Sequence, residues 1–101
     1  MKNFNTPYYA VIFTSVRNDV DNGYAEMATK MEELAAKQPG YLGYESASGK
    51  PNISVSYWES LEDISNWKKN EEHLVTQQKG VNEWYKNYQI RVCKVEREYS
   101  F

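Results

Sequence analysis

The chain has 101 residues, a net charge of -2 and a pI of about 5.4, a size that suits one domain with a modest core. Its charges are mixed without a basic stripe, which makes nucleic acid a poor partner, and no apolar run resembles a signal peptide or reaches the roughly 20 residues of a membrane span. We therefore expect one domain over residues 1–101, in the cytoplasm, with neither a nucleic-acid nor a membrane partner.

Cysteine and histidine each occur once, as Cys93 and His73. A single cysteine forms no internal disulfide and no thiolate metal cluster, so a metal site would have to rely on carboxylates, and we expect none. Aromatic residues make up 15% of the chain although its mean hydropathy is -0.82. Rings that carry an OH or NH group suit half-apolar surfaces, which points to a pocket or an interface built from aromatic side chains.

The first half of the chain predicts a strand, a helix and a hairpin. β-Branched and aromatic residues from 8 to 17 are typical of a strand. Apolar residues then recur at helical spacing from 24 to about 37, where a Pro-Gly pair ends the helix. Two alternating runs, 41–48 and 53–58, flank a loop that contains Gly and Pro, and they predict two strands of a hairpin.

The second half predicts a helix and a final strand. Ser60 and Asp63 resemble a capping box, and an apolar helical face continues from there to about Asn70. Polar, helix-permissive residues follow, and residues 81–85 supply a short apolar turn. Strand character returns over residues 88–99.

The resulting order, βαββαβ, predicts an α+β, ferredoxin-like protomer whose antiparallel sheet carries both helices on one face. Both alternating faces of the first strand are largely apolar, so one of them stays uncovered by helices. Monomers rarely expose such a patch, and its burial at roughly 25 cal/mol per Å² favours association. We expect a homodimer through the sheet face; the alternative is a face with scattered exposed aromatic rings.

Three stretches carry a resemblance to a known family that covers nearly the whole chain. They are the helix-ending QPGYLGYES, the third strand with its exit ISVSYWESLEDISNWKKNEEH, and the closing strand YQIRVCKVEREY. These stretches resemble the antibiotic biosynthesis monooxygenase superfamily of dimeric α/β barrels. The resemblance implies a homodimer whose sheets pack into a barrel, with a pocket between sheet and helices in each protomer. Some members oxidise phenols or quinols with O2 and neither metal nor flavin, whereas others degrade haem.

Three residues are candidates for the chemistry of such a pocket. Trp67 resembles the pocket tryptophan of the superfamily, although a core position also explains it. His73 is a candidate because histidine is the residue type that ordinarily exchanges protons near neutral pH. A lone histidine in a polar segment is, however, more often a surface residue. Tyr57 is a candidate donor to charge that develops on oxygen. The expected substrate-binding rings are Trp58, Trp84, Tyr85 and Phe13.

Other polar positions give weaker predictions. Counting from Trp67, the axial histidine of the haem-degrading relatives falls where this chain has Gln77, so haem is an alternative and no cofactor is the expectation. The adjacent acids Glu71 and Glu72 point about 100° apart on a helix and are interpreted as an exposed face.

The sequence therefore favours a cofactor-independent monooxygenase that acts on a small aromatic or quinol-like molecule. One alternative is a non-catalytic small-ligand binding or stress-related protein that uses the same pocket. The other is a haem-binding or haem-degrading monooxygenase.

Overall fold

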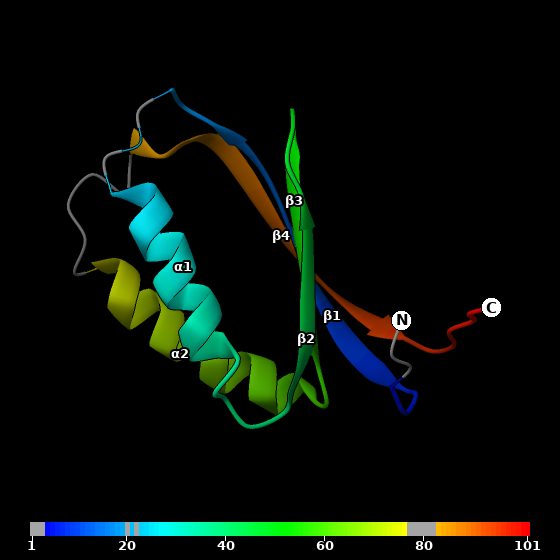
Figure 1. The fold of residues 1–101 in the computed structure, drawn as a ribbon. Coiled ribbons are helices and arrows are strands. Elements are labelled where there is room, and N and C mark those ends of the chain that lie inside the picture. Colours follow the sequence, from blue (N-terminus) through cyan, green and yellow to red (C-terminus); the bar gives the residue numbers. More distant parts are fainter. Residues whose placement is uncertain (1–3, 20, 22, 77–82) are drawn as a thin grey trace.

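The computed structural model describes residues 4–19, 21, 23–76 and 83–101. These residues form four strands and two helices: β1 (Tyr8–Arg17), α1 (Tyr24–Ala35), β2 (Tyr41–Ala47), β3 (Asn52–Trp58), α2 (Leu61–Thr76) and β4 (Tyr85–Val95). The strands pair antiparallel in the order β2-β3-β1-β4, and both helices lie on the same side of the sheet (Figure 1). The predicted ferredoxin-like α+β protomer is confirmed.

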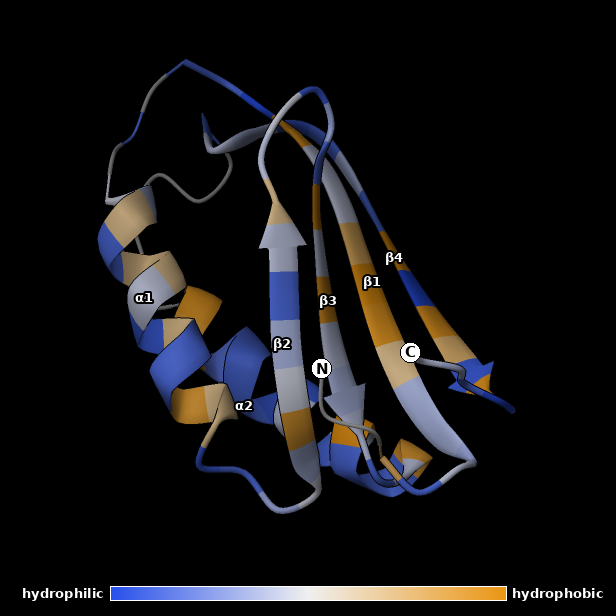
Figure 2. Cartoon of the chain, turned by 45° about the vertical axis from the view of Figure 1, so that its right-hand side comes forward, coloured by the Kyte–Doolittle hydropathy of each residue, from blue (hydrophilic) through white to orange (hydrophobic). Residues whose placement is uncertain are grey.

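Alternation along β1 divides the sheet into a helix-covered face and an outer face. Tyr9 pairs with Trp58 of β3, whose ring lies against α2, so these side chains and Phe13 share the helix-covered face. The intervening residues, such as Ala10 and Ile12, belong to the outer face. Figure 2 brings this outer side forward and shows hydrophobic residues along the middles of β1, β3 and β4. Both faces of β1 carry apolar residues, as the sequence predicts.

The core is centred on two tryptophans, one from the sheet and one from α2. Trp58 is fully buried, and its ring stacks on Trp67 with centroids 6.2 Å apart and planes 22° apart. Ile64 and Ala35 complete the buried cluster, which joins β3 to both helices. The indole N–H of Trp58 donates a hydrogen bond to Ser56 Oγ at 2.9 Å, so burial leaves this donor satisfied.

A tight turn between α1 and β2 positions the start of α2. Gly40 has a φ of 83°, and a Cβ atom at this position would overlap the carboxylate of Asp63. The carbonyl of Gly40 accepts the N–H of Glu59 at 2.8 Å, which ties the turn to the end of β3. Ser60 Oγ accepts the N–H of Asp63 at 3.0 Å and donates to its carboxylate at 2.8 Å. The predicted capping pair is confirmed, and glycine at position 40 gives it room.

α2 extends further than the sequence predicted. It continues to Thr76 rather than ending near Asn70, because the half-buried Leu74 and Val75 prolong the inward face that starts at Ile64. Neither α1 nor α2, the helices of the described residues, is long and apolar enough to cross a membrane.

β4 begins and ends earlier than predicted. Tyr85, assigned from the sequence to a turn, pairs with Arg17 after a register shift in β1, and the strand ends at Val95. Val81, from the same predicted turn, lies outside the described residues. Beyond β4 the chain forms no further strand among the described residues, and Glu98 accepts hydrogen bonds from the N-terminal segment instead.

Candidate functional site

A cavity of about 200 Å³ lies on the helix-covered face, between the sheet and the start of α1. We call it the helix-side hollow. Pockets for drug-sized ligands have volumes of about 300–1,000 Å³, so this smaller cavity suits a molecule with one or two rings. Hydroxyl and aromatic groups from three strands line it, and Ser15 among them is only 1% exposed. The lining that matters for chemistry is Phe13, Ser15, Arg17, Tyr24, Ser46 and Ser54.

Arg17 brings a fixed positive charge to this hollow. Its guanidinium carbon lies 3.4 Å from the centroid of the Tyr24 ring, a cation–π contact. Its Nε donates a hydrogen bond to the carbonyl of Trp84 at 3.0 Å. The two contacts hold the side chain against α1 and the residue that precedes β4, so an anion in the hollow meets a positioned counter-charge.

Three aromatic rings form a cluster beside Arg17. Tyr85 packs edge-on against Phe13 at 5.5 Å and against Tyr24 at 5.6 Å. Burial raises the pKa of the Tyr85 phenol above its usual range, and the hydrogen bond with Tyr24 raises it further, while Arg17 opposes the shift. The Tyr85 phenol therefore stays protonated and presents a neutral hydroxyl rather than an anion.

Glu71 on α2 is half-buried, which corrects the interpretation of Glu71 and Glu72 as one exposed face. Glu72 is exposed, whereas Glu71 is half-buried on the inward side of α2, one turn after Trp67 and two turns after Ile64. Burial raises the pKa of the Glu71 carboxyl, and Lys68 and a hydrogen bond from the Trp67 indole lower it in part. The spacing from Trp67 is the signal that would have identified Glu71.

Arg17 and Tyr24 were also missed from the sequence. Arg17 alternates with Ser15 and Phe13 along β1, so strand periodicity places all three on one face. Tyr24 begins α1, and no local pattern indicates that its ring reaches β4.

Three of the predicted substrate-binding rings lie at or beside the hollow. Phe13 lines it, Tyr85 packs against Phe13, and Trp84 is buried next to them at 3% exposure. The fourth, Trp58, lies in the core, where it stacks on Trp67.

The predicted catalytic residues lie apart from one another. Trp67 is buried in the core, and Tyr57 is on the outer face, where its hydroxyl donates to Glu45. His73 is exposed in the last turn of α2, two positions after Glu71 and hence about 200° around the helix from it. The structure does not bring the three side chains together, and their catalytic roles stay predictions.

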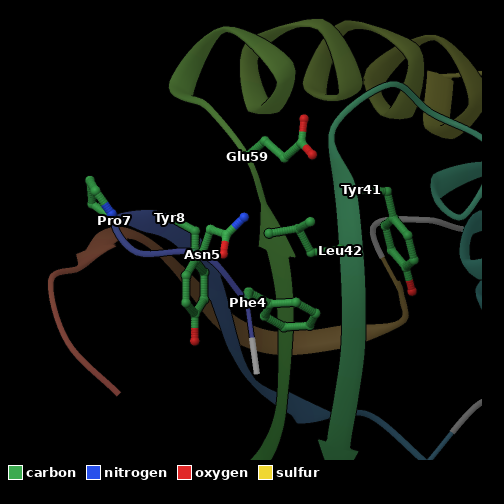
Figure 3. A pocket seen from close by; sticks show the side chains of 7 residues that line it. All are labelled: Phe4, Asn5, Pro7, Tyr8, Tyr41, Leu42 and Glu59. Carbon is green, nitrogen blue, oxygen red and sulfur yellow. The ribbon is translucent and has the colours of Figure 1, made fainter. Parts of the chain in front are cut away.

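A second, larger hollow of about 460 Å³ lies at the N-terminal edge of the sheet. Phe4 and Tyr8 form one wall with ring centroids 5.3 Å apart, and Leu42 and Glu59 also line it (Figure 3). Its described lining contains a carboxylate but no lysine or arginine. An anionic ligand would therefore find no counter-charge there, and the helix-side hollow is the better candidate for one.

Comparison with known proteins agrees with this architecture. The sequence profile of the antibiotic biosynthesis monooxygenases matches residues 7–79. The chain belongs to this family.

Two proteins are similar to this chain over most of its length. The Bacillus subtilis (strain 168) protein YqjZ, which is described as uncharacterized, is 49% identical over 98 residues, covering 94% of this chain and 85% of YqjZ. SnoaB from Streptomyces nogalater, described as a cofactor-independent oxygenase, superposes with a TM-score of 0.73 at 6% identity, covering 92% of this chain and 97% of SnoaB. At that identity, the second similarity shows the shared fold.

A structural neighbour that was solved with a bound porphyrin prompts a test of fit for haem. A mutant of MhuD, solved with two manganese protoporphyrin IX bound per active site, superposes with a TM-score of 0.67 at 15% identity, covering 92% of this chain and 99% of MhuD. In this chain, the described lining of the helix-side hollow holds neither histidine nor cysteine, and His73 is exposed on another side of α2. Gln77 lies outside the described residues. The side chains of the hollow do not fit a histidine-ligated haem.

Proposed function

We propose that this chain is a monooxygenase that transfers oxygen from O2 to a small aromatic, quinol-like substrate without a bound cofactor, as a cytoplasmic homodimer with one helix-side hollow per protomer. The lining of that hollow carries the proposal, because a positioned guanidinium, hydroxyl groups and aromatic rings converge on one small space. Membership of the family and a fold shared with an oxygenase described as cofactor-independent support the same class of reaction.

Direct reaction with O2 requires an electron-rich substrate, and a phenolate is richer in electrons than its phenol. Arg17 favours the ionised form of a bound phenol because an opposite charge within a few ångströms stabilises the anion. Phe13 and Tyr24 exclude water from one side of the hollow, which strengthens that interaction. The Ser15 and Ser54 hydroxyls line the same space as donors for charge that develops on oxygen.

The substrate itself supplies the electrons for this reaction. When a quinol reacts with one O2 to give a hydroxyquinone and water, one oxygen atom becomes bonded to a ring carbon. The other oxygen leaves as water, with the two hydrogens that the substrate loses. The atoms and electrons balance without a reductant, so the protein's tasks are to bind, ionise and shield the substrate.

An oxygen electrode with a panel of one- and two-ring quinols tests the proposal. We expect the uptake of O2 to match the hydroxyquinone formed and to be unaffected by catalase, because no hydrogen peroxide is released. Arg17→Met should lower kcat/KM by about 100-fold, a size typical of removing one charge-stabilising group. Arg97→Met, which changes an exposed arginine beyond β4, is the matched control and should leave the rate unchanged.

A different outcome would identify the alternative function. Binding of quinols, seen as quenching of tryptophan fluorescence, without any uptake of O2 would make the chain a ligand-binding protein with the same hollow. That result overturns the monooxygenase proposal, and so does the absence of both binding and O2 uptake across the panel.

A further inference from the structure

The outer face of the sheet carries one charged residue on each of its two edge strands. β2 and β4 are these edge strands, with β3 and β1 between them (Figure 2). Of the residues that the strand register pairs on the outer face, only Glu45 in β2 and Arg91 in β4 carry a charge. The other paired residues of this face are apolar, small or uncharged. An acid at one edge and a base at the other therefore give this face a polarity across its strands.

The two charged residues lie in one row across the four strands, which we call the charged row. The register joins its members from β2 to β4 in the order Glu45, Val55, Ile12 and Arg91. Neighbouring strands are about 4.8 Å apart, so roughly 14 Å separates the backbones of the two charged residues. Neither of them forms an ion pair within the part of the chain that the structure describes.

An uncharged neighbour on the same face orients each charged group. The Tyr57 hydroxyl donates to Glu45 Oε1, and Arg91 Nη2 donates to Gln89 Oε1 at 2.6 Å. Glu45 and Arg91 are both exposed in the protomer. A second sheet packed over this face would remove the two charges from water, which is costly unless each of them meets an opposite charge. The way in which two copies pack therefore decides whether the charges oppose or favour the dimer.

Two positions of a twofold axis would pack the outer face on a second copy with the strands of both sheets roughly aligned. An axis across the strands places β2 against the partner's β2, so each charge lies at the edge that carries the same charge. An axis parallel to the strands places β2 against the partner's β4 and leaves the height along the strands unchanged. The charged row then faces its own copy in reverse order, and Glu45 meets the partner's Arg91.

We propose that two copies pack their outer faces about an axis parallel to the strands, with Glu45 of each protomer in an ion pair with Arg91 of the partner subunit. One pair lies on each side of an apolar centre in which Val55 packs against the partner's Ile12. Packed sheets are about 10 Å apart, a distance that a glutamate and an arginine side chain span together. Complementary charges of this kind fix the register of an interface. The inference rests on the proposed function, because it takes that homodimer as its starting point.

Charge reversal followed by mixing tests the pairing. Glu45→Arg places an arginine against the partner's Arg91, and Arg91→Glu places a glutamate against the partner's Glu45. Each variant alone should show a dissociation constant at least about 100-fold above that of wild type in sedimentation, because two repulsive contacts replace two attractive ones. Mixed in equal amounts, the two variants regain both opposite-charge contacts in a heterodimer. Its dissociation constant should lie within about tenfold of the wild-type value, and native mass spectrometry identifies it by mass.

Matched reversals on α2 control for the change in net charge. Glu62→Arg and Lys69→Glu alter exposed side chains of the helix layer, on the opposite side of the sheet, and each should dimerise like wild type. Circular dichroism confirms that each variant folds. The wild-type dimer gives a readout without any substitution, since its dissociation constant should rise between about 0.05 and about 0.5 M NaCl as the paired charges are screened.

Three results would overturn the pairing. One is a Glu45→Arg or Arg91→Glu protein that dimerises like wild type, and another is a mixture of the two that remains monomeric. The third is a Glu45→Arg protein that binds wild type more tightly than wild type binds itself, because that result indicates an axis across the strands.

Failure of the proposed homodimer gives a different result from failure of the pairing. A wild-type protein that sediments as a monomer would overturn the homodimer, and the pairing with it. A wild-type dimer whose affinity is unchanged by both reversals would leave the homodimer in place and remove only the ion pairs.

Discussion

The phenols of Tyr8 and Tyr57 lie together on the outer face, each with a carboxylate partner. The Tyr8 hydroxyl donates to Glu98 at 2.6 Å, the Tyr57 hydroxyl donates to Glu45, and the two rings are 5.8 Å apart. Burial, followed by the carboxylate hydrogen bond, raises the pKa of each from 10.0 to about 12. Both effects stabilise the neutral phenol, because ionisation would place an anion beside a carboxylate.

Because of this pair, we expect the free energy of unfolding to fall at strongly alkaline pH. Since the pKa is higher in the folded state, the contribution of each phenol is fully present below pH 10.0 and is lost as the pH rises through about 12. We expect ultraviolet titration to show that Tyr8 and Tyr57 ionise late, as Tyr85 also does, and the urea midpoint to fall across this window.

Conservative variants test the assignment to these two residues. Tyr8→Phe should remove one late-titrating group and part of the loss in urea midpoint between pH 10.0 and about 12. Tyr57→Phe should do the same for the other group. An alkaline profile of Tyr8→Phe that coincides with that of wild type would show that the Glu98 partnership contributes nothing to stability.

At the scale of secondary structure elements, the turn that joins α1 to β2 and the start of α2 depend on each other. Gly40 adopts a left-handed φ of 83° while the Asp63 side chain fills the space where a Cβ atom would lie. Gly23 has a similar φ of 86°, but nothing lies within 4 Å of the position of its Cβ. Substitution of Gly23 therefore measures the backbone strain alone, whereas substitution of Gly40 adds the steric overlap with Asp63.

Gly40→Ala and Gly23→Ala form a matched pair of variants. In both variants the free energy of unfolding should fall by about 1 kcal/mol, because a residue with a side chain is placed in the left-handed region. Gly40→Ala should lose about 1–2 kcal/mol more, because Asp63 must move and α2 loses the cap it forms with Ser60. Urea unfolding of both proteins measures the difference, and equal losses would contradict the role of Asp63.

The element order and the capping pair at Ser60 follow from local patterns, which is why the sequence predicted them. The end of α2 was missed because Leu74 and Val75 follow a polar run, and their partial burial becomes visible only in the folded chain. For the site, Phe13 and Tyr85 were predicted from their residue types. Arg17 was missed because its role depends on α1 docking over β1, and tertiary contacts of that kind leave no local pattern.

At the scale of the whole molecule, the outer face of the sheet is the feature left uncovered by the helices (Figure 1). Ile53 is 42% exposed there, and Ile12, Val55 and Cys93 lie on the same face by strand alternation. A contiguous apolar surface of this kind is typical of an interface. Two copies that pack these faces together would cover it, with the helices and the helix-side hollows on the outside.

Sedimentation of the wild-type protein at micromolar concentration should therefore show a dimer. Ile53→Glu places a charge on the outer face and should raise the dissociation constant at least about tenfold, which corresponds to about 1.4 kcal/mol. Leu61→Glu is the matched control, because Leu61 is 54% exposed at the start of α2 and lies away from the sheet face. A wild-type protein that sediments as a stable monomer, or two variants that dissociate equally, would mean that the outer face is not the dimer interface.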